Sequence, residues 1–297
     1  MSGQRRAVLI AGPTASGKSM LALKRASASG GVIINADSMQ VYDTLRVITA
    51  RPSPQDMVSA EHCLYGTVSV RERFSTGAWV RAVASLLDQV APDREVIFVG
   101  GTGLYFEALT NGFADVPEIS PAEIARVEFE MDGMDEAGRM ALLQREDPET
   151  ASRLKVADPQ RVTRAIAVKR ATGKPLSHFQ QQVQPALLQN WATERMVLWP
   201  DRDMLRSRIA KRFETMFSDG AVEEVEALQR MNLDPSLPAL KAIGVREIAD
   251  WLDGVISREE AIALSVTATH QYAKRQRTWF RNRMAGWPRL GLGGAPI

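Results

Sequence analysis

Short apolar runs, separated by polar stretches, mark the first third of the chain. The runs at 7–11, 32–37 and 94–99 have the length and composition of buried strands. A segment with helix-compatible composition follows the first run, at 18–28. Strands that alternate with helices predict a parallel sheet flanked by helices.

The strand pattern stops after Gly112, and the next part of the chain has the signals of helices. Ser120-Pro121 and Asp158-Pro159 each combine a capping residue with a first-turn proline. We therefore expect a helical domain at 116–185, inserted into an α/β core made of 1–115 and 186–297.

The chain then returns to the predicted core. A β-like segment at 195–199 leads into a helix that begins near Arg202. On this helix Arg208 and Arg212 are four residues apart and share one face. They either bind an anion or form salt bridges with neighbouring acidic residues, and the spacing alone favours neither.

The composition is that of an ordinary globular protein, with 45% hydrophobic and 24% charged residues among 297. No segment approaches the about 18 consecutive apolar residues of a membrane helix, and the chain starts without the pattern of a signal peptide. Cys63 is the single cysteine, so a disulfide framework and a cysteine zinc site are excluded. These features predict a cytoplasmic protein without a membrane anchor.

A glycine-rich motif lies between the first predicted strand and helix. It fits G-x-x-x-x-G-K-[ST], the pattern of a phosphate-binding loop, in which backbone N–H groups and a helix N-terminus face an anion. In this pattern Lys18 reaches a terminal phosphate and the Ser19 hydroxyl binds Mg²⁺. An ordinary turn is the alternative, but the flanking strand and helix favour a P-loop NTPase-like α/β fold. The loop consists of Gly12, Pro13, Thr14, Ala15, Ser16, Gly17, Lys18 and Ser19.

Two further strand ends carry polar residues. Asp37 follows the second predicted strand, and Gly101-Thr102 follow the third. Ligands of open α/β sheets bind beyond the carboxyl ends of the strands, so we expect these residues to lie near the phosphate loop. Asp37 is a candidate Mg²⁺ anchor or general base, and its alternative is a helix cap.

Charge is distributed unevenly, although the net charge is only +2. Residues 115–150 contain eleven acidic and three basic side chains, whereas 151–182 contain seven basic side chains and one acidic. The end of the chain, 270–297, has six basic side chains and no acidic one. Two basic stretches indicate either a polyanion site, with RNA as the leading candidate, or solvated helix faces.

The last predicted helix, 271–281, combines cations with aromatic residues. Lys274, Arg277 and Arg281 have the spacing of one helical stripe, which could neutralise RNA phosphates. We expect the interleaved aromatic side chains to lie mostly in the core, although a ring could stack on an unpaired base. These aromatic residues are Tyr272, Trp279 and Phe280.

Six motifs, in order along nearly the whole chain, resemble those of the tRNA dimethylallyltransferases. The first is the phosphate loop. The others are Asn35-Ala-Asp-Ser-Met-Gln-Val-Tyr42, Val99-Gly-Gly-Thr-Gly-Leu-Tyr105, Asp158-Pro-Gln-Arg-Val-Thr-Arg164, Ile243-Gly-Val-Arg-Glu247 and Ala273-Lys-Arg-Gln-Arg-Thr-Trp-Phe-Arg281. A set of six is far more specific than the phosphate loop alone.

The resemblance implies transfer of a dimethylallyl group from dimethylallyl diphosphate to N6 of the adenosine 3′ of the tRNA anticodon. It implies that the loop holds the diphosphate with Mg²⁺ at Ser19, and that Lys18, Asp37, Thr102 and Arg212 are catalytic. It also implies a monomer whose contacts with tRNA include the pocket for the flipped adenine. The implied tRNA-binding residues are Asp37, Ser38, Met39, Gln40, Thr102, Gln160, Arg161, Val162, Thr163, Arg164, Arg246, Lys274, Arg277 and Arg281.

Some positions depart from the family pattern, among them Arg51 in place of a lysine and His62-Cys63 in place of paired histidines. Other functions stay open at this point. An adenylate dimethylallyltransferase would use the same donor, but it needs neither a helical insertion nor a basic last helix. An ATP-dependent small-molecule kinase or an RNA-binding module with a degenerate nucleotide site would share only parts of the pattern.

Overall fold

The computed structural model describes residues 4–291. They form two compact units: one comprises the residues up to Thr110 together with those from Leu187, and the other is Asn111–Ala186. The helical domain expected at 116–185 falls within the second unit. Among residues 4–291, no helix has both the length and the apolar character needed to cross a membrane.

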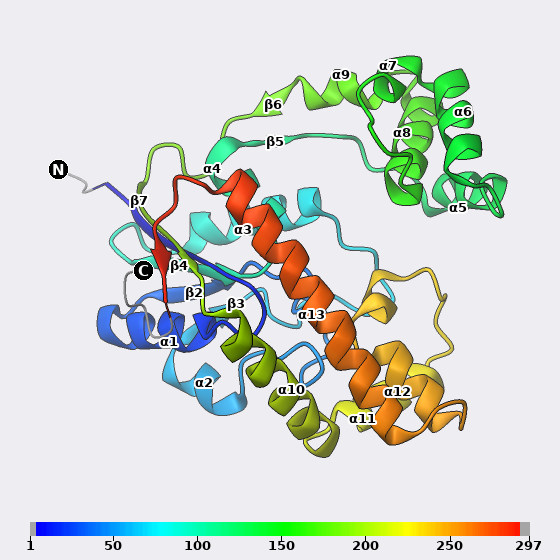
Figure 1. The fold of residues 1–297 in the computed structure, drawn as a ribbon. Helices are drawn as coiled ribbons and strands as arrows, with labels where there is room; N and C mark the ends of the chain where they lie inside the picture. The colour runs from blue at the N-terminus through cyan, green and yellow to red at the C-terminus, as the bar shows by residue number, and fades with distance from the viewer. Residues whose placement is uncertain (1–3, 292–297) are drawn as a thin grey trace. The chain divides into compact units, whose positions relative to one another are not determined.

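The first unit is built on a six-stranded sheet in which every neighbouring pair is parallel (Figure 1). The predicted parallel sheet is therefore confirmed. The strands buried on both faces are continuous apolar runs, as parallel sheets require. In spatial order they are β3 (Glu61–Cys63), β2 (Val32–Asn35), β4 (Val96–Gly100), β1 (Arg6–Ala11), β7 (Ala192–Leu198) and β8 (Arg289–Leu290).

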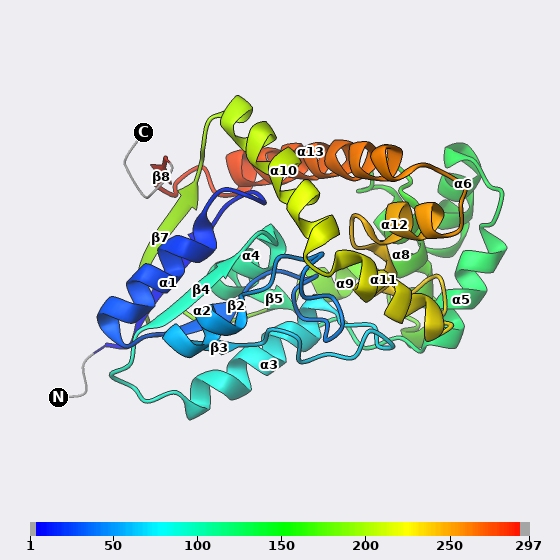
Figure 2. The ribbon, with the colours of Figure 1, turned by 90° about the horizontal axis from the view of Figure 1, so that it is seen from below.

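Helices cover both faces of this sheet, because side chains alternate along each strand. Val8 and Ile10 pack with the apolar residues of α1, whereas Leu9 belongs to a larger core with α3 and the C-terminal helices. Helices α10 and α13 run side by side (Figure 2). The helices of this unit are α1 (Lys18–Ser29), α2 (Pro54–Ser59), α3 (Thr76–Gln89), α4 (Gly103–Asn111), α10 (Arg202–Ser218), α11 (Ala221–Arg230), α12 (Val245–Leu252) and α13 (Arg258–Arg283), with a short 3₁₀ helix at Pro238–Lys241.

Several boundaries differ from the sequence prediction, and for two of them the structure shows the reason. The strand predicted at 32–37 ends at Asn35, because the Asn35 side chain accepts a hydrogen bond from the Asp37 N–H and donates one to the Asp37 carbonyl. The last helix, predicted at 271–281, begins thirteen residues earlier, at Arg258. Its start is fixed by a capping box between Ser257 and Glu260.

The second unit is a small helical bundle with its own core. Ser120 and Asp158 cap their helices as predicted, by accepting bonds from the N–H groups of Glu123 and Arg161. The prediction that strands stop after Gly112 is wrong in one detail, since β5 (Phe113–Ala114) and β6 (Val183–Gln184) form a short antiparallel ribbon. The helices are α5 (Pro121–Glu130), α6 (Glu136–Glu146), α7 (Pro148–Ala151), α8 (Pro159–Thr172) and α9 (Leu176–Gln180).

Candidate functional site

The phosphate loop connects β1 to α1 in a conformation that few residues adopt. Gly17, the N-cap of α1, has φ 90°, which favours glycine, and no side chain caps the helix. A Cβ on Gly12 would lie 2.8 Å from Ser16 Oγ, and that buried hydroxyl has no hydrogen-bond partner among the described residues. The start of α1 therefore keeps N–H groups available for an anion.

Two cations and one carboxylate face each other beside this loop. Burial lowers the pKa of Lys18 to about 8, with Asp37 opposing and Arg212 adding to the effect. Burial also lowers the pKa of Arg212 to about 10, again opposed by Asp37. Arg212 Nη2 donates to Thr14 Oγ1 at 2.5 Å, and its Nε is buried without a partner among residues 4–291. This cluster has more positive charge than its own carboxylate balances, which suits a multiply charged anion.

Asp37 lies in a tight turn directly beyond β2. Its Oδ1 accepts a hydrogen bond from the Met39 N–H at 3.0 Å. No helix begins there, because the residues that follow form bends and turns. The capping alternative for Asp37 is therefore wrong, and its carboxylate borders the cavity described below.

The turn that holds Asp37 is fixed by the end of β4. A Cβ on Gly100 would lie 1.9 Å from the Ala36 carbonyl oxygen, so only glycine permits this approach. Thr102 Oγ1 accepts from the Ser38 N–H at 2.9 Å and donates to Ser38 Oγ at 3.2 Å. The two hydrogen bonds of the Thr102 hydroxyl with Ser38 thus support the turn that holds Asp37.

A cavity of 260 Å³ lies where these segments meet, and we call it the strand-end cavity. It brings together the Thr14, Asp37 and Arg212 side chains that the sequence placed far apart. Burial raises the pKa of Tyr272, and nearby Asp37 adds to this effect, so the phenol is neutral. The lining residues are Thr14, Asp37, Ser38, Met39, Ile48, Thr49, Arg212, Phe213, Lys241, Ala242, Ile243, Thr269, Tyr272 and Arg275.

Several of these lining residues were not predicted from the sequence. Lys241, Tyr272 and Arg275 border the cavity from the C-terminal part of the chain. Gln276 was also missed, although it contacts the phosphate loop: its Oε1 accepts from the Thr14 N–H at 2.9 Å. The one sequence signal was an uncharged Gln within a basic helix.

Gln40, predicted to contact the adenine, has another role. Its side chain is buried, and Nε2 donates to the carbonyl oxygens of Thr49 and Ala50, each at 2.8 Å. The amide therefore holds the 49–50 segment, while the neighbouring Ser38 and Met39 side chains do line the strand-end cavity. The sequence motif could not separate these roles, because all of these residues are consecutive.

The predicted basic stripe on α13 is only partly exposed. Lys274 and Arg281 are exposed, but Arg277 is half-buried. Arg277 Nη1 donates to the Pro200 carbonyl at 2.7 Å, and its guanidinium lies 4.1 Å from the Trp199 ring centroid. Arg277 thus attaches α13 to the segment that follows β7.

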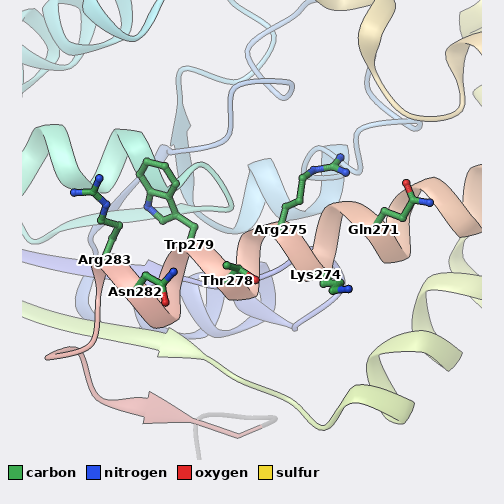
Figure 3. Close-up of a pocket in the computed structure, with 7 residues that line it drawn as sticks. All are labelled: Gln271, Lys274, Arg275, Thr278, Trp279, Asn282 and Arg283. Carbon is green, nitrogen blue, oxygen red and sulfur yellow. The ribbon is translucent and has the colours of Figure 1, made fainter. Parts of the chain in front are cut away.

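A hollow of 510 Å³ is lined by residues of α13, and we call it the α13 hollow. Arg275, Trp279 and Arg283 project to the same side of the helix, as Figure 3 shows. Arg275 also lines the strand-end cavity, so the two spaces share one cation. The hollow is lined by Gln271, Lys274, Arg275, Thr278, Trp279, Asn282 and Arg283.

The predicted tRNA-binding motif on α8 divides by helix face. Gln160 and Arg161 are exposed, whereas Val162 and Thr163 are buried in the core of the second unit. The side chains of these two buried residues cannot reach RNA, which corrects the prediction. Arg164 is partly buried and donates weakly to the Pro117 carbonyl at 3.4 Å.

The uneven charge of the sequence is partly neutralised inside the second unit. Arg170, from the basic stretch, pairs with Glu130 at 2.8 Å and Glu146 at 3.2 Å in the acidic stretch. In the first unit, Arg246 is exposed, and its Nε lies 3.6 Å from Asp250 on the same helix. Charge along the sequence therefore overstates the free positive surface.

The fold and the strand-end cavity together define an α/β protein of the phosphate-binding-loop class with a carboxylate beside its anion site. The family model described as IPP transferase matches residues 40–283. The chain belongs to this family and is a transferase.

Close relatives match the chain over nearly its full length. The tRNA dimethylallyltransferases of Allorhizobium ampelinum and Rhizobium meliloti are 51% and 47% identical to it, each over 96% of this chain and 94% of the relative.

Solved structures agree with this assignment. The tRNA delta(2)-isopentenylpyrophosphate transferase of Staphylococcus epidermidis superposes with a TM-score of 0.67 at 30% identity, covering 97% of this chain and 93% of that one. A eukaryotic dimethylallyltransferase acting on tRNA has a TM-score of 0.77 over 97% of this chain and 74% of its own. At 24% identity, it supports the fold alone.

Proposed function

We propose that this transferase moves a dimethylallyl group from dimethylallyl diphosphate to N6 of the adenosine 3′ of the anticodon in tRNA. The observation that carries the proposal is the strand-end cavity, in which Asp37 lies beside the phosphate loop and Arg212. The relatives that match this chain over nearly their full length are named tRNA dimethylallyltransferases. A cytoplasmic enzyme is consistent with the free cysteine, Cys63, and we propose that it acts as a monomer.

The donor end of the proposed reaction is the phosphate loop. The adenosine amine is a weak nucleophile, so the bond to diphosphate breaks only if the charge that develops on the leaving group is stabilised. Lys18 and Arg212 are partly buried cations at that position, and the open N-terminus of α1 adds N–H donors. Arg212 and Thr14 hold each other, which orients the arginine before the donor binds.

Mg²⁺ fits the donor end as a partner of the diphosphate. Among residues 4–291, no group of three or more His, Cys, Asp or Glu side chains forms a metal cage. Mg²⁺ needs no such cage when it keeps waters and binds phosphate oxygens. The exposed Ser19 hydroxyl, in the first turn of α1, is the residue that would hold it. When bound, Mg²⁺ neutralises negative charge on the diphosphate.

The acceptor end of the proposed reaction is Asp37. As the N6 amine forms its bond to the allyl carbon, it must lose a proton, and Asp37 is the carboxylate that lines the cavity. A base within an RNA loop reaches the cavity only when it is swung out of its stack. Tyr272 and Met39 offer apolar surface to such a base, and a base bound there would exclude water that could hydrolyse the donor.

The RNA itself is proposed to bind on α13. Arg275 and Arg283 project to the same side of α13 as the indole of Trp279, whereas Lys274, also a cation of the α13 hollow, extends from a different side of the helix (Figure 3). Cations and a ring on one face suit phosphates and an unpaired base. Exposed Gln160, Arg161, Arg246 and Arg281 are additional candidate contacts.

Asp37→Ala tests the assignment of the base. We expect loss of transfer by at least about 100-fold, since general base catalysis contributes at least that much, while tRNA binding changes less than about twofold. Rates and filter binding are measured on the same preparation. Equal loss of transfer and binding would contradict the role of Asp37 as a base.

The proposed reaction is tested with radiolabelled dimethylallyl diphosphate, Mg²⁺ and unmodified tRNA, with AMP as a parallel acceptor. Label on tRNA alone is expected. Label on AMP alone would assign the chain to the nucleotide-accepting branch. Label on neither, beside an active control enzyme, would contradict the proposal, and calorimetry with ATP and with dimethylallyl diphosphate would then identify the ligand of the loop.

A further inference from the structure

The side chain of Gln276 lies between the two halves of the proposed active site. It projects from α13 and is 5% exposed. Its Oε1 accepts a hydrogen bond from the Thr14 N–H at 2.9 Å, and its Nε2 donates to the Gly101 carbonyl at 3.0 Å. One amide thus bridges the phosphate loop and the end of β4, which are far apart in sequence.

The first bond limits what Thr14 can do for a ligand. Its N–H is satisfied by Gln276, and its hydroxyl accepts from Arg212 at 2.5 Å. Thr14 is therefore held from two sides, by α13 and by α10. The N–H groups that remain for a diphosphate are those nearer the uncapped start of α1.

The second bond places Gln276 close to the carboxylate. A Cβ on Gly101 would lie 2.2 Å from Gln276 Nε2 and 3.2 Å from Asp37 Oδ2. The amide of Gln276 and the carboxylate of Asp37 therefore flank the same glycine. Any larger residue at 101 would push one of them away.

We propose that Gln276 is a positioning residue that sets the phosphate loop relative to the turn carrying Asp37. This inference rests on the proposed function, since it assigns the loop to the leaving group and Asp37 to the acceptor. Rates of transfer depend steeply on the alignment of these two sides. A buried side-chain amide, satisfied at both ends, is suited to hold such an alignment.

Gln276→Met tests this role, because it preserves the length of the side chain but removes both hydrogen bonds. Without these two bonds the phosphate loop is no longer held against the turn that carries Asp37, which predicts a loss of about 10-fold or more in kcat for transfer, together with weaker binding of the donor. The readouts are kcat for transfer, the Kd of inorganic diphosphate with Mg²⁺, measured by calorimetry, and the KM of dimethylallyl diphosphate. The Kd of tRNA should change less than about twofold.

Phe280→Leu is the matched control for a purely structural effect. Phe280 is 1% exposed on the same helix, so its truncation destabilises α13 without removing either bond of Gln276. We expect Phe280→Leu to lower Tm while leaving the diphosphate Kd unchanged. Gly101→Ala disturbs the same hydrogen bond without changing Gln276, because the added Cβ would displace the Gln276 amide. This variant should also raise the KM of the donor.

The role of Gln276 would be overturned by a Gln276→Met enzyme with wild-type kcat, wild-type diphosphate Kd and wild-type donor KM. It would also be overturned if Phe280→Leu weakened diphosphate binding as much at an equal loss of Tm. Failure of the proposed function has a different signature: the wild-type protein would bind diphosphate but label no tRNA, whatever residue stands at 276.

Discussion

Two arginines, one in each unit, occupy opposite kinds of site. Arg170 in the second unit lies between Glu146 and Glu130, whose hydrogen bonds raise its pKa. Arg212 in the first unit donates to the Thr14 hydroxyl, and burial lowers its pKa to about 10. Arg170 is a structural cation paired with two carboxylates, whereas Arg212 has no hydrogen bond to a carboxylate among residues 4–291, and we propose that an anionic ligand is its partner. An arginine paired with carboxylates therefore stabilises the fold, whereas one without such a partner is a candidate for binding a ligand.

Removal of the Arg212 guanidinium tests whether it stabilises charge on the leaving group. Arg212→Ala should lower kcat for transfer by about 100- to 1000-fold, as expected for loss of one preorganised donor to developing charge. Arg170→Ala is the matched control, and it should reduce the stability of the fold while leaving kcat within about twofold. Steady-state kinetics and urea unfolding are measured on both variants. Equal losses of kcat would show that the two arginines are alike in function.

Lys18 is the second partly buried cation beside the phosphate loop, and its charge should depend on pH. Its pKa is lowered to about 8, so the ammonium is charged below that pH and is lost as the pH rises through it. Binding of dimethylallyl diphosphate should therefore weaken above pH 8, by up to about tenfold per pH unit. Arg212 stays charged through the same range, since its pKa is about 10.

The control for this pH dependence is Lys18→Ala. That variant should bind the donor weakly at every pH, without the decline above pH 8 that follows from the lowered pKa of Lys18. Calorimetry between pH 6.5 and 9.5 measures both proteins. A decline that survives in Lys18→Ala would assign the titration to another group.

A smaller effect concerns the exposed cations of the α13 hollow. Combined Lys274→Ala, Arg275→Ala and Arg283→Ala should weaken tRNA binding and reduce its salt slope by about 2, because fewer counterions are released. Lys24→Ala, which removes an exposed cation of α1, is the control and should leave the slope unchanged. If single Arg281→Ala reduced the slope as much as the triple variant, the RNA would follow the predicted stripe instead of the hollow.

Arg277→Ala tests whether this arginine stabilises the fold by attaching α13 to the segment after β7. It removes the hydrogen bond to the Pro200 carbonyl and the contact with Trp199. We expect a loss of about 1–2 kcal/mol in the free energy of unfolding, with tRNA affinity nearly unchanged. Urea denaturation and filter binding separate the two. A large loss of tRNA affinity at wild-type stability would return Arg277 to the RNA-binding surface.

The parts of the site that were predictable from sequence are local. The phosphate loop is one continuous motif between a strand and a helix, and Asp37 follows a strand whose end has a known place in α/β sheets. The parallel sheet follows from buried apolar runs alone. Such features can be predicted because each depends only on residues that are neighbours along the chain.

The parts that escaped prediction depend on distant contacts or on side-chain direction. Gln276 meets Thr14 across a separation of 262 residues, and no local pattern announces this contact. Arg277 has the sequence spacing of a basic stripe, but in the structure it contacts Trp199 and Pro200. Val162 belongs to a predicted motif but points into the core, because adjacent residues of a helix face different directions.

We propose that an adenosine amine of an RNA loop is alkylated in the strand-end cavity. The most direct test incubates labelled dimethylallyl diphosphate and Mg²⁺ with two anticodon stem-loops that differ at one base. One has adenosine 3′ of the anticodon, and the other has purine riboside, which lacks the N6 amine. We expect label only in the adenosine loop, recovered after digestion as an N6-alkylated adenosine. Equal labelling of both loops, or label at another nucleoside, would contradict it.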